Sequence, residues 1–251
     1  MARQEYVGAA GARGTVLVWN GMIPLKDDIK ARSAPVVTAG LIFANVLVFA
    51  YQLSLPLHRE QEIALRFGLV PGFVTGAVPH PPGGEALTLA SFFTSMFLHG
   101  DLLHIAGNML FLWIFGNNVE DAMGKGRFLV FYLTCGLAAA TAQILALPRS
   151  TLPMIGASGA IAGVLGAYFL LFPQARILTL VPFIFVYFVR LPAFVVLGVW
   201  FVLQVTSSLA GGRSGVAWSA HVGGFVAGMV LLGLFLPRRR RSPPPAEGDW
   251  I

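Results

Sequence analysis

The chain has 251 residues, of which 56% are hydrophobic and 11% are charged. Soluble domains carry about 25% charged residues, so this composition excludes an ordinary soluble domain and predicts an integral membrane protein. A net charge of +6 is also found in proteins that bind nucleic acid. The basic residues, however, gather at the ends of apolar stretches and in the run Arg238 to Arg241, as the positive-inside rule describes for membrane proteins, so we expect no nucleic-acid partner. The single Cys135 excludes an internal disulfide.

The two ends of the chain are polar. Residues 1–35 mix both charges and hold no continuous apolar core of the kind that a signal peptide has, and Met22 resembles an alternative start. Residues 237–251 are basic and then rich in proline. The predicted organisation is a cytoplasmic N-terminal segment over 1–35, a six-helix membrane domain over 36–236 and a cytoplasmic tail over 237–251.

Apolar stretches along the chain predict an all-α membrane protein with six spans, over residues 36–55, 102–119, 128–147, 158–172, 192–209 and 216–236. The fourth span is shorter than the roughly 20 residues that cross a bilayer. Its first residue, Ser158, is therefore expected to lie below the membrane surface. We expect the long loop 57–100 to be partly embedded in the membrane interface, and residues 177–189 to form an interfacial or re-entrant segment.

The positions of the lysines and arginines predict the orientation of these spans. Most of them fall on the side that carries the N-terminus, which the positive-inside rule assigns to the cytoplasm. Six spans return the C-terminus to that side. We expect a multi-pass protein of a bacterial-type plasma membrane, with both termini cytoplasmic. The chain shows no internal repeat, which argues against an inverted-repeat transporter.

Three polar side chains are expected at one depth in the membrane. Counted from the inner ends of their spans at about 1.5 Å per residue, Ser158 lies about 21 Å up, and His104 and His221 lie about 22 Å up. In a hydrocarbon core about 30 Å thick, all three are then below the outer surface. Ionisable side chains at such a depth are functional by default.

The chemistry of these residues favours nucleophilic catalysis. Ser158 and His221 suit each other as nucleophile and base, because a serine hydroxyl attacks well only when an imidazole takes its proton. Asn108 lies one turn from His104 on the same helix face. Two donors facing a serine would stabilise an oxyanion, and the backbone N–H of Ser158, at a helix N-terminus, would add a third.

The predicted spans contain no Asp or Glu. We therefore expect a two-residue Ser–His arrangement in which packing, and not a carboxylate, orients the histidine. Close approach of the fourth and sixth spans is favoured by small residues at four-residue spacing, namely Gly159 and Gly163 on one and Gly224 and Gly228 on the other.

This set of residues resembles the rhomboid family of intramembrane serine proteases. The resemblance rests on four motifs in order along the chain: His104-x-x-x-Asn108, Glu120-x-x-x-Gly124, Gly156-x-Ser158-Gly159 and Ala220-His221-x-x-Gly224. It implies a six-transmembrane-helix, rhomboid-like bundle with a short central helix that carries the nucleophile.

The resemblance also implies a role for each site residue. Ser158 would be the nucleophile and His221 the general base and acid, while His104, Asn108 and the Ser158 amide would form the oxyanion hole. Gly156 belongs, with the four glycines named above, to the helix packing near the site. Some family members stack an aromatic ring on the catalytic histidine from the position that Ala162 occupies here.

The function so implied is an endopeptidase that cleaves transmembrane segments near the outer membrane face. Its partners would be transmembrane protein substrates and the lipid bilayer, with no cofactor and no metal. Two alternatives stay open. One is a catalytically inactive rhomboid-like protein that binds membrane clients, and the other is a transporter lined by His99, His104 and His221.

Overall fold

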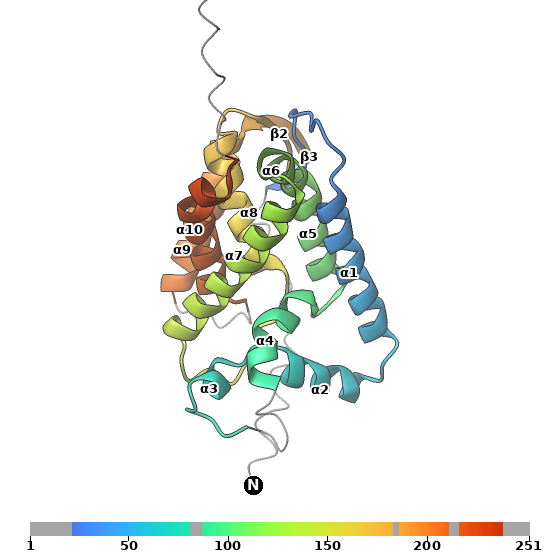
Figure 1. Ribbon diagram of the computed structural model, residues 1–251, viewed down its shortest axis with the longest axis vertical. Coiled ribbons are helices and arrows are strands. Elements are labelled where there is room, and N and C mark those ends of the chain that lie inside the picture. Colours follow the sequence, from blue (N-terminus) through green and yellow to red (C-terminus); the bar gives the residue numbers. More distant parts are fainter. Residues whose placement is uncertain (1–21, 81–86, 183–185, 211–215, 238–251) are drawn as a thin grey trace, which may run out of the picture.

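The computed structural model describes residues 22–80, 87–182, 186–210 and 216–237 and shows a bundle of helices with a small β-sheet at one end (Figure 1). The elements in chain order are β1 (Ile23–Lys26), α1 (Val36–Leu53), α2 (Leu57–Phe67), α3 (Pro71–Val74), α4 (Thr88–Thr94), the 3₁₀ helix η2 (Ser95–Phe97), α5 (Leu102–Phe111), the π-helical turn η3 (Leu112–Gly116), α6 (Asn117–Met123), α7 (Lys125–Ala146), α8 (Ser158–Leu171), β2 (Arg176–Pro182), β3 (Val186–Pro192), α9 (Ala193–Leu209) and α10 (Trp218–Phe235).

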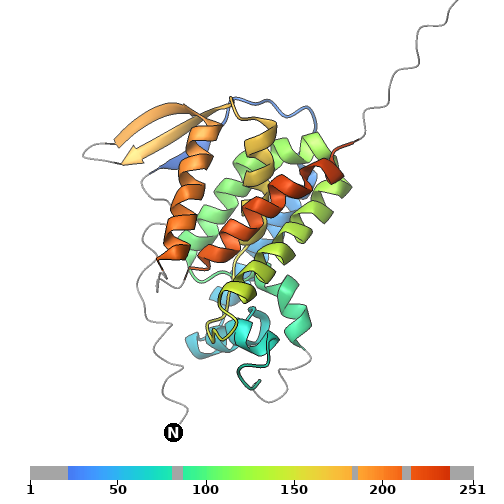
Figure 2. The same ribbon diagram turned by 90° about the vertical axis from the view of Figure 1, so that its left-hand side faces the viewer.

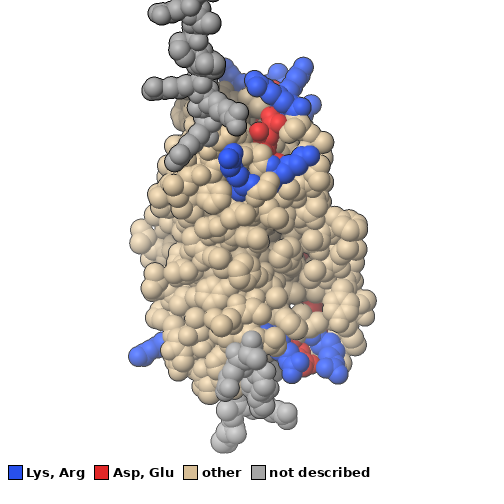
Figure 3. All heavy atoms as spheres, in the orientation of Figure 1, with Lys and Arg blue, Asp and Glu red and all other residues tan. Residues whose placement is uncertain are grey.

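The described helices carry a broad uncharged surface. Four helical stretches among them are long and apolar enough to cross a membrane, namely Val36–Leu53, Leu102–Met123, Lys125–Ala146 and Trp218–Phe235. The shorter helices α8 and α9 are also apolar. Charged side chains gather at the two ends of the molecule and leave a wide band between them almost free of charge on the face shown in Figure 3. The chain is therefore a multi-pass membrane protein.

The helix bounds follow the predicted spans to within a few residues. The main difference is in the second apolar stretch, which continues past Val119 to Met123 and is interrupted by the π-turn η3. Such π-turns occur mostly inside α-helices and often at functional sites. Here the turn begins four residues after Asn108.

Helix α8 is buried on every side over most of its length. Its residues from Ala160 to Tyr168 are all buried, and its closest neighbours are α7 and α10. Figure 2 shows α10 lying beside α7 along most of its length. A helix that is apolar all round has no face suited to water, and so it is stable only when other elements or lipid surround it.

A three-stranded antiparallel sheet, in the order β1-β2-β3, was not expected in an all-α chain. Residues 177–182 and 186–189 lie in the paired strands β2 and β3 and do not form the predicted re-entrant segment, with Ile177 paired to Leu191 and Thr179 to Val189. Strands β2 and β3 extend beyond the helices at the end of the molecule opposite α2 and α3 (Figure 2). Ile177 and Thr179, two residues apart, are fully buried, as the two-residue period of a strand requires.

The start of α1 is held by carboxylates of α6. Glu120, 1% exposed, accepts hydrogen bonds from the backbone N–H groups of Val37 (3.0 Å) and Thr38 (2.7 Å) and from the Thr38 hydroxyl (2.8 Å). These N–H groups have no partners within the helix, so Glu120 caps α1 from a distant part of the chain. Asp121 in turn accepts from the N–H and hydroxyl of Ser33.

The N-terminal segment also docks onto the C-terminal end of α8. Asp27 accepts a hydrogen bond from the Tyr168 hydroxyl (2.7 Å) and another from the Asn118 amide. Burial raises the pKa of the Asp27 carboxyl above its ordinary value, although the bond from Tyr168 opposes this shift. Asp27 therefore joins the predicted N-terminal segment to the helix that begins with Ser158.

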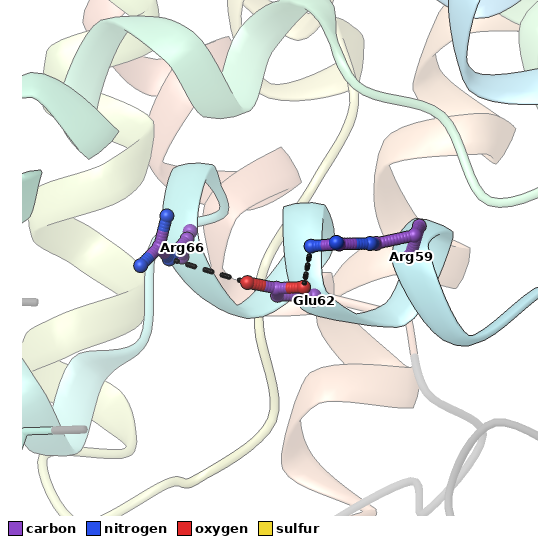
Figure 4. Close-up of polar contacts among 3 residues, drawn as sticks. All are labelled: Arg59, Glu62 and Arg66. Carbon is purple, nitrogen blue, oxygen red and sulfur yellow. Dashed lines mark hydrogen bonds and ion pairs between the residues drawn. The ribbon is translucent and has the colours of Figure 1, made fainter. Parts of the chain in front are cut away.

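The long loop between α1 and α5 is largely helical and includes a polar helix. In α2, Glu62 lies between Arg59 (2.9 Å) and Arg66 (3.7 Å), and all three side chains are exposed (Figure 4). Exposed ion pairs of this kind add little stability. Together with α1 and η2, this helix lines a groove of roughly 570 Å³. Neither Ser158 nor His221 lines that groove.

Candidate active site

Ser158 and His221 meet between two helices. Ser158 is the first residue of α8 and His221 lies in the first turn of α10. The Ser158 Oγ is 2.9 Å from His221 Nε2, within hydrogen-bonding distance. His221 is 3% exposed, whereas Ser158 is only half-buried. The pair thus joins a buried base to a hydroxyl that a substrate could reach.

Glycines allow the two helices to approach this closely. A Cβ added to Gly224 would overlap the carbonyl oxygen of Gly159, and one added to Gly228 would overlap that of Gly163. The backbones of α8 and α10 are therefore in direct contact at these points, as expected for small residues at membrane helix interfaces. The two contacts lie directly beyond the Ser158–His221 pair.

His104 and Asn108 face the chain just before Ser158. Gly156 has φ +123°, a conformation that a side chain rarely adopts. A Cβ at Gly156 would lie 2.7 Å from His104 Nε2 and 3.6 Å from Asn108 Nδ2. The two side chains of α5 thus come close to the backbone of the Gly156–Ser158 turn. Gly156 itself is fixed there by a hydrogen bond from its N–H to the carbonyl of Ser95 (2.8 Å).

Both side chains present hydrogen-bond donors to this turn. The Nδ1 atom of His104 accepts a bond from the N–H of Gly100 (3.4 Å), which leaves the proton on Nε2, the atom that faces Gly156. Asp101 caps α5 and accepts from the backbone N–H of His104 (2.8 Å). The amide nitrogen of Asn108 is buried and has no hydrogen-bond acceptor within the described chain. A buried donor without a partner calls for an explanation, and an incoming oxygen atom would supply one.

Residues of α9, together with Trp218 of α10, surround the ring of His221. The Nδ1 atom of His221 lies 2.8 Å from the side-chain oxygen of Gln204, which is fully buried. The ring of Trp200 lies 5.9 Å from the His221 ring at an interplanar angle of 35°, and Trp218 packs against it edge-on at 6.0 Å. His221 thus has a polar partner that was not predicted, and this partner is an amide and not a carboxylate. Gln204 could have been noticed in the sequence, since a polar amide within an apolar span is itself a functional signal.

His99 lies near the site but is held by structural contacts. Its backbone N–H and carbonyl both bond to the side-chain amide of Gln52 in α1, each at 3.0 Å. Its ring lies 5.1 Å from that of His104. In the part of the chain that the structure describes, no three His, Cys, Asp or Glu side chains are grouped so as to hold a metal ion.

These observations define a class of protein: a multi-pass membrane protein with a hydrogen-bonded serine and histidine inside its helical bundle. The rhomboid-domain family model matches residues 86–238, and the chain therefore belongs to the rhomboid family, whose members are generally intramembrane serine proteases. The match covers every residue of the candidate site, from His104 to Gly228.

Three relatives show how far the similarity extends. Over 176 residues the chain is 32% identical to the mitochondrial Rhomboid protein 1 of Saccharomyces cerevisiae, covering 64% of this chain and 47% of that one. Over 74 residues it is 46% identical to the rhomboid protease GluP of Bacillus subtilis, covering 30% and 14%. Over 140 residues it is 30% identical to the mitochondrial presenilin-associated rhomboid-like protein of Rattus norvegicus, covering 55% and 33%. The matched parts span less than half of each relative.

Proposed function

We propose that this chain is an intramembrane serine endopeptidase with Ser158 as nucleophile and His221 as general base and acid. The observation that carries the proposal is the 2.9 Å contact between Ser158 Oγ and His221 Nε2 in a rhomboid-family chain. His221 takes the proton as Ser158 attacks the scissile carbonyl and then passes it to the leaving amine. Water hydrolyses the resulting acyl-enzyme, with His221 again acting as the base.

We propose that His104 and Asn108 stabilise the oxyanion formed in each step. The donors His104 Nε2 and Asn108 Nδ2 face the turn that leads to Ser158, and the Asn108 nitrogen is buried without an acceptor. Preorganised donors of this kind act on charge that develops only in the transition state. The backbone N–H of Ser158, at the start of α8, is the third donor.

The depth of the serine sets the expected substrate. With six spans and both termini cytoplasmic, Ser158 lies about 9 Å below the outer surface, from a core of about 30 Å and a rise of about 1.5 Å per residue. A substrate helix must unwind before its peptide bond can reach the serine. We therefore expect cleavage of single-span proteins near the outer end of the span, after a small residue and before helix-breaking Gly or Pro.

The membrane in which the chain works is part of the proposal. We assign it to a bacterial-type plasma membrane, with the site facing outward, in keeping with the GluP relative from Bacillus subtilis. Two of the compared relatives carry "mitochondrial" in their names. Localisation of a tagged chain in its own cells tests this assignment, and mitochondrial location would overturn it.

The test of the proposed function uses purified protein in proteoliposomes with a fluorescently labelled single-span substrate. Wild-type protein should cleave it, and Ser158→Ala and His221→Ala should each abolish cleavage while the protein stays folded. Because the two residues act as one unit, the double variant should be no worse than either single variant. Substrate binding without cleavage by the wild type would instead favour the client-binding alternative. Dependence of activity on a divalent metal would favour the transporter alternative.

A further inference from the structure

We propose that Gln204 is a positioning residue that fixes the tautomer and the ring orientation of His221. The inference rests on the proposed function, in which His221 is the base. It would turn the expected Ser–His pair into a chain of three residues drawn from α8, α10 and α9. The third member is a neutral amide, where serine hydrolases often use a carboxylate.

The two ends of the Gln204 amide have different partners. Its nitrogen donates to the backbone carbonyl of Trp200 (3.2 Å), one helical turn earlier in α9. A carbonyl can only accept a hydrogen bond, so the NH₂ end must face it. The amide oxygen is thereby turned toward His221, with 2.8 Å between Oε1 and Nδ1.

This orientation determines where the proton of the imidazole lies. An amide oxygen only accepts, so His221 must carry its proton on Nδ1. Nε2 then has a free lone pair, and it is this atom that lies 2.9 Å from Ser158 Oγ. With the proton on Nε2 instead, the ring could not receive the serine proton. Gln204 therefore selects the one neutral tautomer in which His221 can act as a base.

A merely structural role for Gln204 is less well supported. Helices α9 and α10 are already joined by a second polar contact, 2.9 Å between the hydroxyls of Ser208 and Ser219, one turn further along α9. Gln204 is fully buried, and its oxygen contacts the His221 ring itself, which also packs against Trp200 and Trp218. The contact at Ser208 thus provides a matched control, because it links the same helices without touching the base.

The test compares three variants with the wild type in proteoliposomes, using the labelled single-span substrate. Gln204→Met removes the acceptor at similar size and should lower kcat about tenfold to a hundredfold with KM unchanged, by analogy with the loss of a hydrogen-bond partner that orients a metal-binding histidine. Gln204→Glu keeps an acceptor oxygen at the same reach and should restore most of the lost kcat. Ser208→Ala should leave kcat and KM unchanged. The thermal unfolding temperature of each variant shows whether it is folded.

A second readout does not depend on cleavage. Nitrogen-15 NMR of histidine-labelled protein, with His221 assigned from the spectrum of His221→Ala, should show a proton on Nδ1 in the wild type and in Ser208→Ala. Gln204→Met should lose this preference. If Gln204→Met keeps the Nδ1 proton, or loses no more kcat than Ser208→Ala, Gln204 does not position the base. If the wild type shows the expected tautomer but cleaves nothing, the proposed function fails while the positioning role stands.

Discussion

Replacing Gly228 by alanine tests whether the contact between α8 and α10 sets the geometry of the Ser158–His221 pair. A Cβ at Gly228 would overlap backbone atoms of Gly163. Backbone cannot swing aside as a side chain can, so the helices themselves must move apart. Gly233 lies on the same helix, and a Cβ there would meet nothing within 4 Å. Gly233→Ala is therefore a matched control with the same change in composition and helix propensity.

The expected effect of Gly228→Ala on stability and rate follows from the overlap between the new Cβ and the backbone of Gly163. Carbon atoms pack at about 3.5–4.0 Å, so the overlap requires a displacement on the order of 1 Å. Overpacking of this kind typically costs about 1–3 kcal/mol of stability. A displacement of about 1 Å at a catalytic pair can lower the rate about a hundredfold. The 2.9 Å contact between Ser158 and His221 lies on the same two helices.

Two measurements check this prediction: denaturant unfolding in detergent micelles, and the rate at which a serine-directed fluorophosphonate labels the protein. Gly228→Ala should lower the free energy of unfolding by about 1–3 kcal/mol. The fluorophosphonate should label this variant about a hundredfold more slowly than the wild type. Gly233→Ala should match the wild type in both. If Gly228→Ala unfolded and reacted like Gly233→Ala, the contact with Gly163 would not determine the geometry of the site.

Three further predictions concern other parts of the molecule. His104→Ala and Asn108→Ala should each lower kcat by about 10²–10³, or about 2.7–4 kcal/mol, with little change in KM; a raised KM at unchanged kcat would make them substrate-binding residues. Glu120→Gln should destabilise the fold by about 2–3 kcal/mol in chemical denaturation, because a buried carboxylate with three charge-assisted hydrogen bonds is lost. Asp121→Asn, which affects exposed hydrogen bonds from Ser33, should change the free energy of unfolding by less than about 1 kcal/mol. Equal effects of the two variants would refute the capping role. Burial, followed by the neighbouring His104, lowers the pKa of His99 to about 3, below its unfolded value of about 6.5; the unfolded chain therefore binds more protons between these values, so stability is complete above pH 6.5 and falls as the pH drops toward 3. At pH 4.5 this loss is on the order of 2–3 kcal/mol, and His99→Phe should remove it from the pH dependence of unfolding; an unchanged pH dependence would contradict the assignment.

The part of the site that could be predicted is the part that helical geometry determines. Polar residues at equal distances from the inner ends of three apolar stretches placed Ser158, His104 and His221 at one level. The structure has Ser158 in hydrogen-bonding contact with His221 and has His104 beside the turn before Ser158. The roles of these residues stay a prediction. Glycine spacing likewise indicated a close α8–α10 contact, and in the structure a Cβ at Gly224 would overlap the carbonyl oxygen of Gly159.

What the sequence did not reveal depends on contacts between distant residues. Gln204 was not among the predicted site residues: the predicted spans hold no carboxylate, but an amide oxygen can also accept a hydrogen bond from an imidazole. The β-sheet was not predicted because Leu178 and Leu180 on one face of the strand and Ile177 and Val181 on the other make it apolar on both faces, which periodicity alone cannot distinguish from a membrane-embedded segment. Its pairing with β1 joins Leu180 to Ile23, far away in the sequence.

The position of the cut in a substrate tests the central claim most directly. Wild-type protein in proteoliposomes is incubated with a single-span substrate that carries small residues and a downstream helix breaker near the outer end of its span, and the products are identified by mass spectrometry. We predict one cut near the outer end, after a small residue, absent with Ser158→Ala and much slower when the helix breaker is replaced by leucine. A cut at the cytoplasmic end, or one that persists in Ser158→Ala, would contradict the proposed catalytic serine, its depth or its orientation in the membrane.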